Sequence, residues 1–333
     1  MNALKVGIIG GGGIAGAHGP YLKSRDDVEL VALADVNEAA GRASAERFGI
    51  AQVFTDYREL IPHVDAVLVC VPTWLHSEVA IAALEAGRAV FCEKPMARTL
   101  QQADAMLQAA KKADHRLQLG FVRRFDAEWL AWGEAVQAEK IGRPVVWRDL
   151  AAFEGPSAPW YNQDELGGGP FLDGCIHNLD FALMTFGRAK WAFCHGRTLN
   201  PTHTAIDTGT ATVRFQSGDE LLLAWSWGLP AGVSGTRVFE VFGPQGIISW
   251  PKGEAAQASE GKTVFVVNNG ENSERIESPQ SALGDAFDAQ MDEFIAVARG
   301  EKSPRAGGQQ GRDALAVALA ILESARSEQV VHL

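Results

Sequence analysis

Four consecutive glycines, Gly10 to Gly13, stand between an apolar, β-branched run at residues 5–9 and a helical pattern that begins near Ala15. A strand that passes through a glycine turn into a helix is the first unit of a doubly wound sheet, and its turn can approach a pyrophosphate closely. The backbone amides at the start of the helix then face the phosphates. The motif can also be read one residue later, ending at Gly16, and by itself it is equally consistent with a purely structural turn. The surrounding sequence therefore decides between a dinucleotide-binding turn and a purely structural one.

The context is a regular alternation of strand and helix patterns from residue 5 to about residue 121. Short β-branched runs alternate with longer segments whose apolar residues recur at helical spacing, which is typical of a parallel sheet covered on both faces. The sequence therefore predicts an α/β, doubly wound (Rossmann) domain over residues 1–122. The expected strands are 5–9, 29–34, 66–71, 89–92 and 117–121, and the expected helices are 38–48, 77–86 and 100–113.

The pattern changes after Asp126, and we expect a second domain over residues 123–333. A helix at 126–140 is followed by a stretch rich in Gly, Pro and Trp, and from Trp191 the chain favours long strands bounded by turn residues. This predicts an α+β domain with an open, mainly antiparallel sheet and helices on one face. The expected strands are 209–215, 220–227, 236–242, 247–250 and 263–268. Two terminal helices, 285–298 and 310–327, should pack on the body of the protein, on this domain or back on the first.

Length and composition agree with two globular domains and exclude several kinds of partner. A chain of 333 residues is long for one core and short for three. Hydrophobic residues make up 47% and charged residues 21%, as in ordinary globular proteins. The formal net charge of -11 opposes nucleic-acid binding, because phosphates would be repelled. Backbone amides can still hold a dinucleotide locally, so a small-molecule ligand remains compatible with this charge.

Neither a membrane segment nor an export signal is expected. No apolar run approaches the roughly 18 residues that a membrane helix needs, and the N-terminus enters the first strand without a basic segment or apolar leader. Cys70, Cys92, Cys175 and Cys194 are widely spaced and three stand in apolar segments, which favours buried free thiols over disulfides or a zinc site. We expect a soluble protein of the reducing cytoplasm with no metal ion.

Asp35 ends the second expected strand, twenty residues after Ala15. At this spacing an acidic residue meets the hydroxyls of the adenosine ribose, and its charge would repel the 2′-phosphate of NADP. NAD is therefore favoured over NADP, although the nearby Arg42 keeps NADP open as the less favoured cofactor. The alternative is that Asp35 caps the helix that starts near Asn37.

Two further strand ends place polar residues at the edge where open α/β sheets bind ligands. One is Val71 with the loop Pro72 to His76, and the other is Glu93 followed by Lys94. For His76 we favour the ordinary role of a residue at a helix N-terminus over a catalytic role. Lys94 is expected to lie over the ligand-binding cleft at this edge of the sheet. The alternative is that it is an ordinary solvated surface lysine.

In the second domain, a glycine-rich run at 167–169 leads into an expected helix that carries Asp173 and His177. Residues four apart share a helix face, and a carboxylate one turn from an imidazole can orient the ring for proton transfer. A structural His–Asp pair would have the same pattern. The preceding loop, 154–165, contains Trp160, which either stacks on a sugar ring or packs beneath the loop.

Taken together, these elements make the chain resemble the glucose-fructose oxidoreductase / inositol dehydrogenase / rhizopine catabolism (Gfo/Idh/MocA) family over nearly its whole length. The resemblance implies a Rossmann domain followed by an open antiparallel sheet domain that often mediates oligomers. One departure is Trp74, where many relatives carry a small or amide residue. The matching segments are Gly10 to His18, Asp35, Pro72 to His76, Glu93-Lys94-Pro95, residues 120–126, and the glycine-rich run that leads to Asp173 and His177.

The resemblance also implies a catalytic trio of Lys94, Asp173 and His177. His177 would take the hydroxyl proton, Lys94 would hydrogen-bond the same oxygen, and Asp173 would orient the substrate or the imidazole. The expected substrate-binding residues are Lys94, Arg124, Trp160, Asp173 and His177. The expected cofactor-binding residues are Gly10, Gly12, Gly13, Ile14, Ala15, Asp35, Val71, Pro72, Thr73, Trp74, His76, Glu93 and Lys94.

The resulting prediction is an NAD-dependent dehydrogenase that moves a hydride between NAD and a carbinol carbon of a sugar, polyol or inositol-like substrate. Two alternatives stay open: a relative that uses bound NAD for a net non-redox reaction such as glycoside cleavage, and a non-catalytic dinucleotide-binding sensor. We also expect a homo-oligomer, a dimer or a tetramer, built through the second sheet. The apolar residues that suggest it are Trp225, Trp227, Val238 and Phe239.

Overall fold

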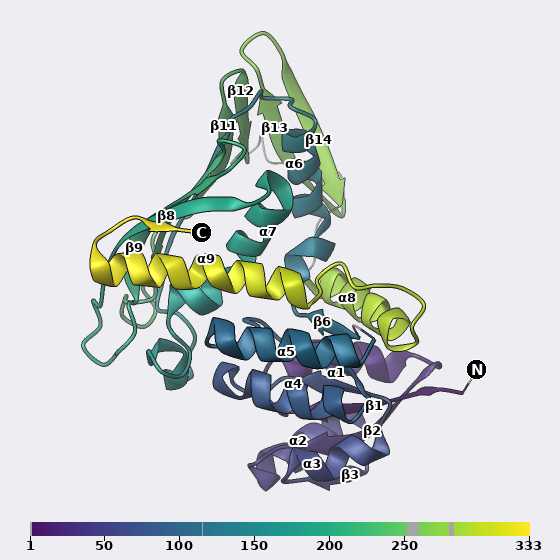
Figure 1. Cartoon of the computed structure of the whole chain (residues 1–333). Coiled ribbons are helices and arrows are strands. Elements are labelled where there is room, and N and C mark those ends of the chain that lie inside the picture. Colours follow the sequence, from purple (N-terminus) through teal and green to yellow (C-terminus); the bar gives the residue numbers. More distant parts are fainter. Residues whose placement is uncertain (1, 115, 252–259, 280–282) are drawn as a thin grey trace. The chain divides into compact units, whose positions relative to one another are not determined.

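The computed structural model describes residues 2–114, 116–251, 260–279 and 283–333 (Figure 1). They form two compact units: unit 1 lies within Met1–Phe125 and Leu283–Arg312, and unit 2 within Asp126–Ala282 and Asp313–Leu333. Helix α8 (Leu283–Ala298) thus belongs to unit 1, and α9 (Gly308–Ser327) contributes residues to both units. The division of function between residues 1–122 and 123–333 stays a prediction.

Unit 1 is built on a six-stranded, fully parallel sheet, as the alternating pattern predicts. The strand order is β3-β2-β1-β4-β5-β6, so the order reverses between β1 and β4. Open α/β sheets bind their ligands at the carboxyl ends of the strands beside such a reversal. The sequence did not predict the short edge strand β3. The strands are β1 (Leu4–Ile9), β2 (Val28–Ala34), β3 (Gln52–Phe54), β4 (Ala66–Val69), β5 (Ala89–Cys92) and β6 (Leu117–Leu119).

The crossover helices of unit 1 begin and end at residues with clear capping roles. Asn37 accepts a hydrogen bond from Ala40 N at the start of α2, Gly49 ends that helix with φ 74°, and Thr99 caps α5 through Gln102 N. Side-chain caps of this kind satisfy amides that have no partner inside the helix. The helices are α1 (Ala15–Ser24), α2 (Glu38–Phe48), α3 (Tyr57–Leu60), α4 (His76–Glu85) and α5 (Leu100–Lys112).

The C-terminal helix α8 completes the core of unit 1. Its Met291 and Phe294 are fully buried in one cluster with Ile8 and Phe91 of the sheet. The rings of Phe91 and Phe294 meet edge to face, with centroids 5.6 Å apart. The expected packing of this terminal helix on the body of the protein is therefore confirmed, and the structure assigns it to the first unit.

Unit 2 contains a nine-stranded mixed sheet in the order β14-β13-β12-β11-β7-β10-β9-β8-β15. Its pairs are antiparallel except for the central β7 and β10, which run parallel. The predicted mainly antiparallel sheet is confirmed, whereas the sequence did not predict β7, β14 or β15, and indicated β8 only as part of a strand-rich stretch from Trp191. The strands are β7 (Val146–Ala152), β8 (Ala189–Arg197), β9 (Thr208–Phe215), β10 (Glu220–Ser226), β11 (Val238–Gly243), β12 (Gly246–Ser249), β13 (Lys262–Asn268), β14 (Ser273–Pro279) and β15 (Val331–His332).

One face of this sheet carries helices α6 (Ala127–Gln137) and α7 (Ile176–Phe186). Trp132 of α6 and Phe181 of α7 meet with ring centroids 4.9 Å apart, and Trp147 of β7 lies equally close to Trp132. Side chains alternate along each strand, so Leu221 and Leu223 of β10 are fully buried. Leu222 between them points to the opposite, open face and is half-buried.

The apolar residues chosen to suggest an oligomer lie mostly elsewhere. Phe239 packs against Trp132 in the helix-covered core, Trp227 is only 3% exposed and Trp225 only 9%. Trp225 and Trp227 are therefore largely buried and Phe239 is half-buried, and assembly through this sheet stays a prediction. Register decides their direction: Phe239 pairs with Asp149 and faces the helices, and Val238, which pairs with Leu150, is on the open face.

All four cysteines are free and buried, as expected. Burial raises the pKa of each thiol, that of Cys194 to about 12 and those of Cys70, Cys92 and Cys175 well above their usual range. Because only the thiolate is reactive, we expect essentially no labelling of the native protein by a disulfide reagent at pH 8. All four should react after denaturation. Rapid native labelling of even one thiol would contradict this.

Candidate functional site

The glycine turn after β1 forms an open cradle. Gly10 has φ +94°, and a Cβ there would lie 2.6 Å from the carbonyl oxygen of Cys70, so only glycine fits. By contrast, a Cβ on Gly12 or Gly13 would meet nothing within 4 Å. The amides of these two residues donate to no other described residue. Free amides at a helix N-terminus beside open space are what a pyrophosphate requires.

Asp35 closes the other side of this turn. One carboxylate oxygen accepts from Gly11 N and the other from Asn37 N, both at 2.8 Å. The helix cap is Asn37 itself, which accepts from Ala40 N, so the alternative of Asp35 as the cap is wrong. Asp35 is thereby fixed at the end of β2 beside the glycine turn, with lone pairs left for ribose hydroxyls.

Arg42, which kept NADP open in the sequence, is paired within its own helix. Its guanidinium donates to Glu38 Oε1 at 2.6 and 3.0 Å, four residues away on the exposed side of α2. A 2′-phosphate would have to compete with this carboxylate. The local geometry therefore favours NAD further.

The loops after β4 and β5 are held together by His76. Its Nδ1 lies 2.7 Å from the carbonyl oxygen of Pro95, and its Nε2 lies 2.8 Å from that of Val71. The ring is buried at the start of α4, after the 3₁₀ turn η2 (Thr73–Leu75). His76 thus joins the two loops expected to face the cofactor, and its role there stays a prediction.

Glu93, directly before Lys94, is buried and paired. Its Oε1 lies 2.8 Å from Nε2 of His18, and its Oε2 accepts from Lys94 N at 3.2 Å. Burial raises the pKa of this carboxyl, but the hydrogen bond and charge of His18, together with Lys94, hold it below its usual value. The carboxylate is therefore ionised. The sequence did not reveal the partnership with His18, because the two residues are 75 positions apart.

Arg124 lies in the 3₁₀ segment η3 (Val122–Phe125) at the end of the first stretch of unit 1. It is 9% exposed, and its Nη1 donates to the carbonyl oxygen of Arg305 at 2.9 Å. The guanidinium of Arg305 in turn lies 4.9 Å from the centre of the Phe125 ring. Arg124 is therefore anchored by the backbone.

In unit 2, the loop with Trp160 is folded tightly against the glycine run. Trp160 and Tyr161, in η4 (Pro159–Asn162), stack with centroids 3.7 Å apart. A Cβ on Gly167 would lie 2.4 Å from Tyr161 Cα, so a side chain there is excluded. Gly169 N donates to the carbonyl oxygen of Tyr161 at 2.9 Å. These contacts give the aromatic pair a fixed position.

Asp173 and His177 lie in two different helical segments rather than in one α-helix. Residues Pro170–Gly174 form a π-helical turn, η5, in which Cys175 N donates to the carbonyl oxygen of Pro170 at 2.7 Å. His177 is in the first turn of α7. The expected helical segment is present, but it begins with a π-helical turn that leads through Cys175 into α7. Such π-turns occur frequently at functional sites. Asp173 is buried and His177 half-buried.

The start of α7 is tied to the sheet by a polar group that the sequence did not reveal. Asn178 donates to Asp149 Oδ2 at 2.6 Å, and Arg237 donates to the same oxygen at 2.9 Å. Asp149 is fully buried on β7, a strand missing from the prediction. Burial alternates along Val146–Ala152, but its sequence VWRDLAA does not alternate between apolar and polar residues, so no clear local pattern marked this strand. This network holds the residue next to His177.

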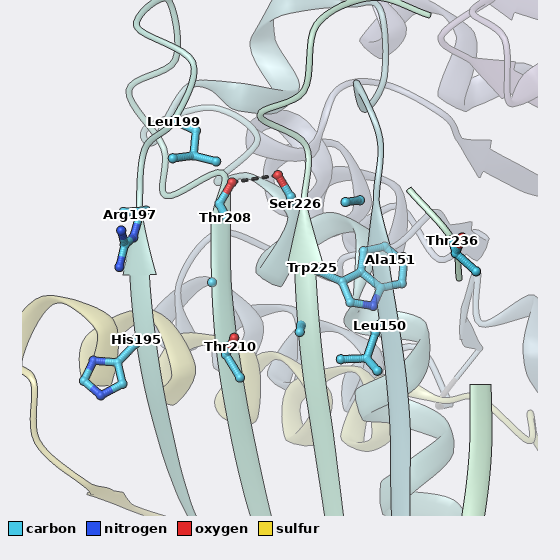
Figure 2. A pocket seen from close by; sticks show the side chains of 13 residues that line it. Leu150, Ala151, His195, Arg197, Leu199, Thr208, Thr210, Trp225, Ser226 and Thr236 are labelled. Atoms are coloured by element: carbon cyan, nitrogen blue, oxygen red, sulfur yellow. Dashed lines mark hydrogen bonds between the residues drawn. The ribbon is translucent and has the colours of Figure 1, made fainter. Parts of the chain in front are cut away.

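A shallow pocket of about 490 Å³ lies on the open face of the unit 2 sheet (Figure 2). His195 and Arg197 stand at its β8 side, and the hydroxyls of Thr208 and Ser226 hydrogen-bond across it at 2.7 Å. Its floor includes Leu150. The pocket is distinct from the segment that carries Asp173 and His177.

The described residues offer neither a metal site nor a membrane-spanning helix. No group of three or more His, Cys, Asp or Glu is arranged there to hold a metal ion. In the same part of the chain, every helix is too short or too polar to cross a bilayer.

A glycine cradle at the reversal of a parallel sheet, with a carboxylate fixed at the end of the second strand, defines a dinucleotide-binding protein of the Rossmann class. Comparisons narrow this class. Residues 4–121 match the oxidoreductase family described as GFO_IDH_MocA, NAD-binding Rossmann fold, and residues 129–249 match the GFO/IDH/MocA C-terminal domain. The chain belongs to the Gfo/Idh/MocA oxidoreductase family, whose Rossmann domain is described as NAD-binding.

Individual relatives agree with this assignment. The chain is 33% identical to myo-inositol 2-dehydrogenase of Thermotoga maritima, over 99% of this chain and 98% of the relative. It is 33% identical to D-glucoside 3-dehydrogenase of Escherichia coli, over 68% of this chain and 71% of the relative. Among solved structures, a probable dehydrogenase from Thermotoga maritima is 32% identical with a TM-score of 0.79, covering 99% of this chain and 98% of that one.

Proposed function

We propose that this enzyme transfers a hydride between NAD and a carbinol carbon of a sugar, polyol or inositol-like substrate. The observation that carries the proposal is the match along nearly the whole chain to myo-inositol 2-dehydrogenase. The glucoside and scyllo-inositol dehydrogenases among the relatives also act, by their names, on polyhydroxylated substrates. A ring secondary alcohol is the reacting group that these substrates share.

The proposed chemistry uses Lys94, Asp173 and His177. Bound NAD supplies the hydride acceptor. His177 takes the proton of the substrate hydroxyl as the C–H hydride leaves, so the alcohol becomes a carbonyl. Lys94 donates a hydrogen bond to the same oxygen and stabilises its developing negative charge. Asp173 orients the imidazole or a substrate hydroxyl, and reduction follows the same path in reverse.

Other residues would bind rather than react. The cradle at Gly10 to Ala15 and the carboxylate of Asp35 would hold the dinucleotide, with the loops at 71–76 and 93–94 beside them. Arg124 and Trp160 would contact the substrate, and the fixed stack of Trp160 on Tyr161 offers a flat aromatic surface of the kind that packs on sugar rings.

The direct test is a screen of inositols, polyols, aldoses and glucosides for NADH formation, followed by product stoichiometry. One NADH per ketone or lactone formed would support the dehydrogenase. Turnover of a glycoside without net NADH would support the non-redox alternative. NAD binding without turnover of any substrate class would support the sensor.

We infer that NAD is preferred over NADP because of Asp35. Asp35→Ser should lower the ratio of kcat/KM with NAD to kcat/KM with NADP by roughly 10- to 100-fold, because a charge-assisted hydrogen bond is worth about 1.5–3 kcal/mol. Arg42→Ala is the matched control and should leave the ratio nearly unchanged, because Arg42 already pairs with Glu38. A wild-type preference for NADP would refute the assignment.

We propose that two or four copies assemble through the open face of the unit 2 sheet. Half-buried Leu150, Leu222 and Val238 line that face, where water would otherwise cover apolar surface. Light scattering at micromolar concentration should show a dimer or tetramer, and Leu222→Glu should weaken it. Lys112→Glu, on α5 of unit 1, is the control. A monomeric wild type would contradict the proposal.

We also infer a cytoplasmic location. Four buried free thiols suit a reducing compartment, in which disulfides seldom form. Fractionation of the source cells, with enzyme activity followed in each fraction, would test this.

A further inference from the structure

The hydrogen-bonded pair of His18 and Glu93 lies inside unit 1 and is almost entirely buried. His18, on α1, is 0% exposed and Glu93, after β5, is 4% exposed. The His18 ring is held edge-on between Phe91 and Phe287, with centroids 5.1 and 5.2 Å away. An imidazole clamped in this way can offer its Nε2 in one direction only, toward Glu93.

The second oxygen of Glu93 is constrained independently. It accepts from the amide of Lys94, and a Cβ on Gly120 would lie 2.7 Å from it. The carboxylate is therefore confined by His18 on one side, by the Lys94 backbone on another and by Gly120 beneath. Lys94 cannot shift its amide without breaking a hydrogen bond to a buried charge.

Stability alone does not account for this arrangement. Moving a carboxylate out of water costs more free energy than moving an apolar side chain of the same size. A buried ion pair on average stabilises the fold no more than apolar residues in its place. A buried pair that also binds the backbone of a neighbouring functional residue serves to fix geometry, as partners of metal-ligating and catalytic groups do.

We propose that His18 and Glu93 are positioning residues for Lys94: the buried pair fixes the backbone from which the Lys94 side chain reaches the substrate oxygen. This rests on the proposed role of Lys94. Because a misplacement of about 1 Å can cost roughly 100-fold in rate, Glu93→Ala and His18→Leu should each lower kcat by about 10- to 100-fold. The Kd for NAD should change by much less than kcat, because the glycine turn and Asp35 are expected to hold most of the dinucleotide.

Conservative variants separate positioning from a merely structural role. Glu93→Gln keeps an acceptor for Lys94 N and can donate to neutral His18, and His18→Gln keeps a donor for Glu93. The kcat of each Gln variant should be at least about tenfold higher than that of its Ala or Leu counterpart. The thermal midpoints of the two variants in each pair should be similar. If the Gln variants lose as much kcat as Glu93→Ala and His18→Leu, the positioning role is wrong. It is also wrong if NAD affinity falls in parallel with kcat.

A double-mutant cycle separates this inference from the proposed function. Lys94→Ala alone tests whether Lys94 acts in the reaction. In the Lys94→Ala background, Glu93→Ala should cost less than about threefold more in kcat, because the residue to be positioned is gone. Fully multiplicative losses would show that Glu93 acts through another route, and would overturn the inference even if Lys94 is catalytic.

Discussion

Replacing His177 or Lys94 by alanine is expected to lower kcat by roughly 10²- to 10⁴-fold, the usual cost of losing a general base or its partner. The Kd for NAD should change by much less than kcat, because the glycine turn and Asp35, which are proposed to hold most of the dinucleotide, are unchanged in both variants. The drop in kcat, measured at saturating NAD and substrate, therefore reports the chemical step.

The control for this prediction is His332→Ala, an exposed histidine of the same unit on β15, which should leave kcat unchanged. The thermal midpoint of each variant is measured alongside, since His177 is half-buried in the first turn of α7. A His177→Ala protein that melts early but keeps near-normal turnover while folded would make the residue structural and the proposed mechanism wrong.

The second large effect is expected in the core of unit 2. Trp132→Ala should lower the free energy of unfolding by about 3–5 kcal/mol, as truncation of a fully buried aromatic residue does. The Trp132 ring lies with its centroid 4.9 Å from those of Trp147 and Phe181 and 6.1 Å from that of Trp129. Its removal would leave a cavity between α6, α7 and β7 that rigid neighbours cannot fill.

Calorimetry measures this loss as a shift of roughly 6–20 °C in the transition of the unit that contains Trp132. Trp132→Phe is the matched variant and should cost clearly less. It keeps most of the ring contacts and removes an indole N–H that has no hydrogen-bond partner among the described residues. An Ala variant that melts within about 2 °C of the wild type would show that the aromatic cluster repacks.

All strands of unit 1 except the short edge strand β3 could be predicted, because their signal is local. Parallel strands covered on both faces are continuous apolar runs, such as Ala66–Val69 and Ala89–Cys92, and each is followed by turn residues. The glycine turn and Asp35 could be predicted equally well. The turn requires a positive φ at Gly10, which is a local property of the backbone, and Asp35 stands at a strand end at a fixed spacing from the turn.

The strands missed in unit 2 depend on distant partners. β7 contains Arg148 and Asp149, residue types that by themselves do not favour strands. In the folded chain Arg148 pairs with Glu240. Asp149 accepts hydrogen bonds from Asn178 and Arg237. β14 is largely polar and is defined by its pairing with β13. Register likewise directs Phe239 toward the helices, where it is half-buried, although the sequence suggested an exposed apolar face.

The sequence by itself determined the Rossmann unit, its NAD cradle and the residues that resemble a catalytic trio, because these follow from short patterns along the chain. Only the tertiary structure joined His18 to Glu93 across 75 positions and placed Asp149 beneath Asn178. Only the tertiary structure shows that Pro170–Gly174 form a π-helical turn. The physical reason is that a buried charge is tolerated only where folding brings its partner, and that partner is set by topology rather than by sequence neighbours.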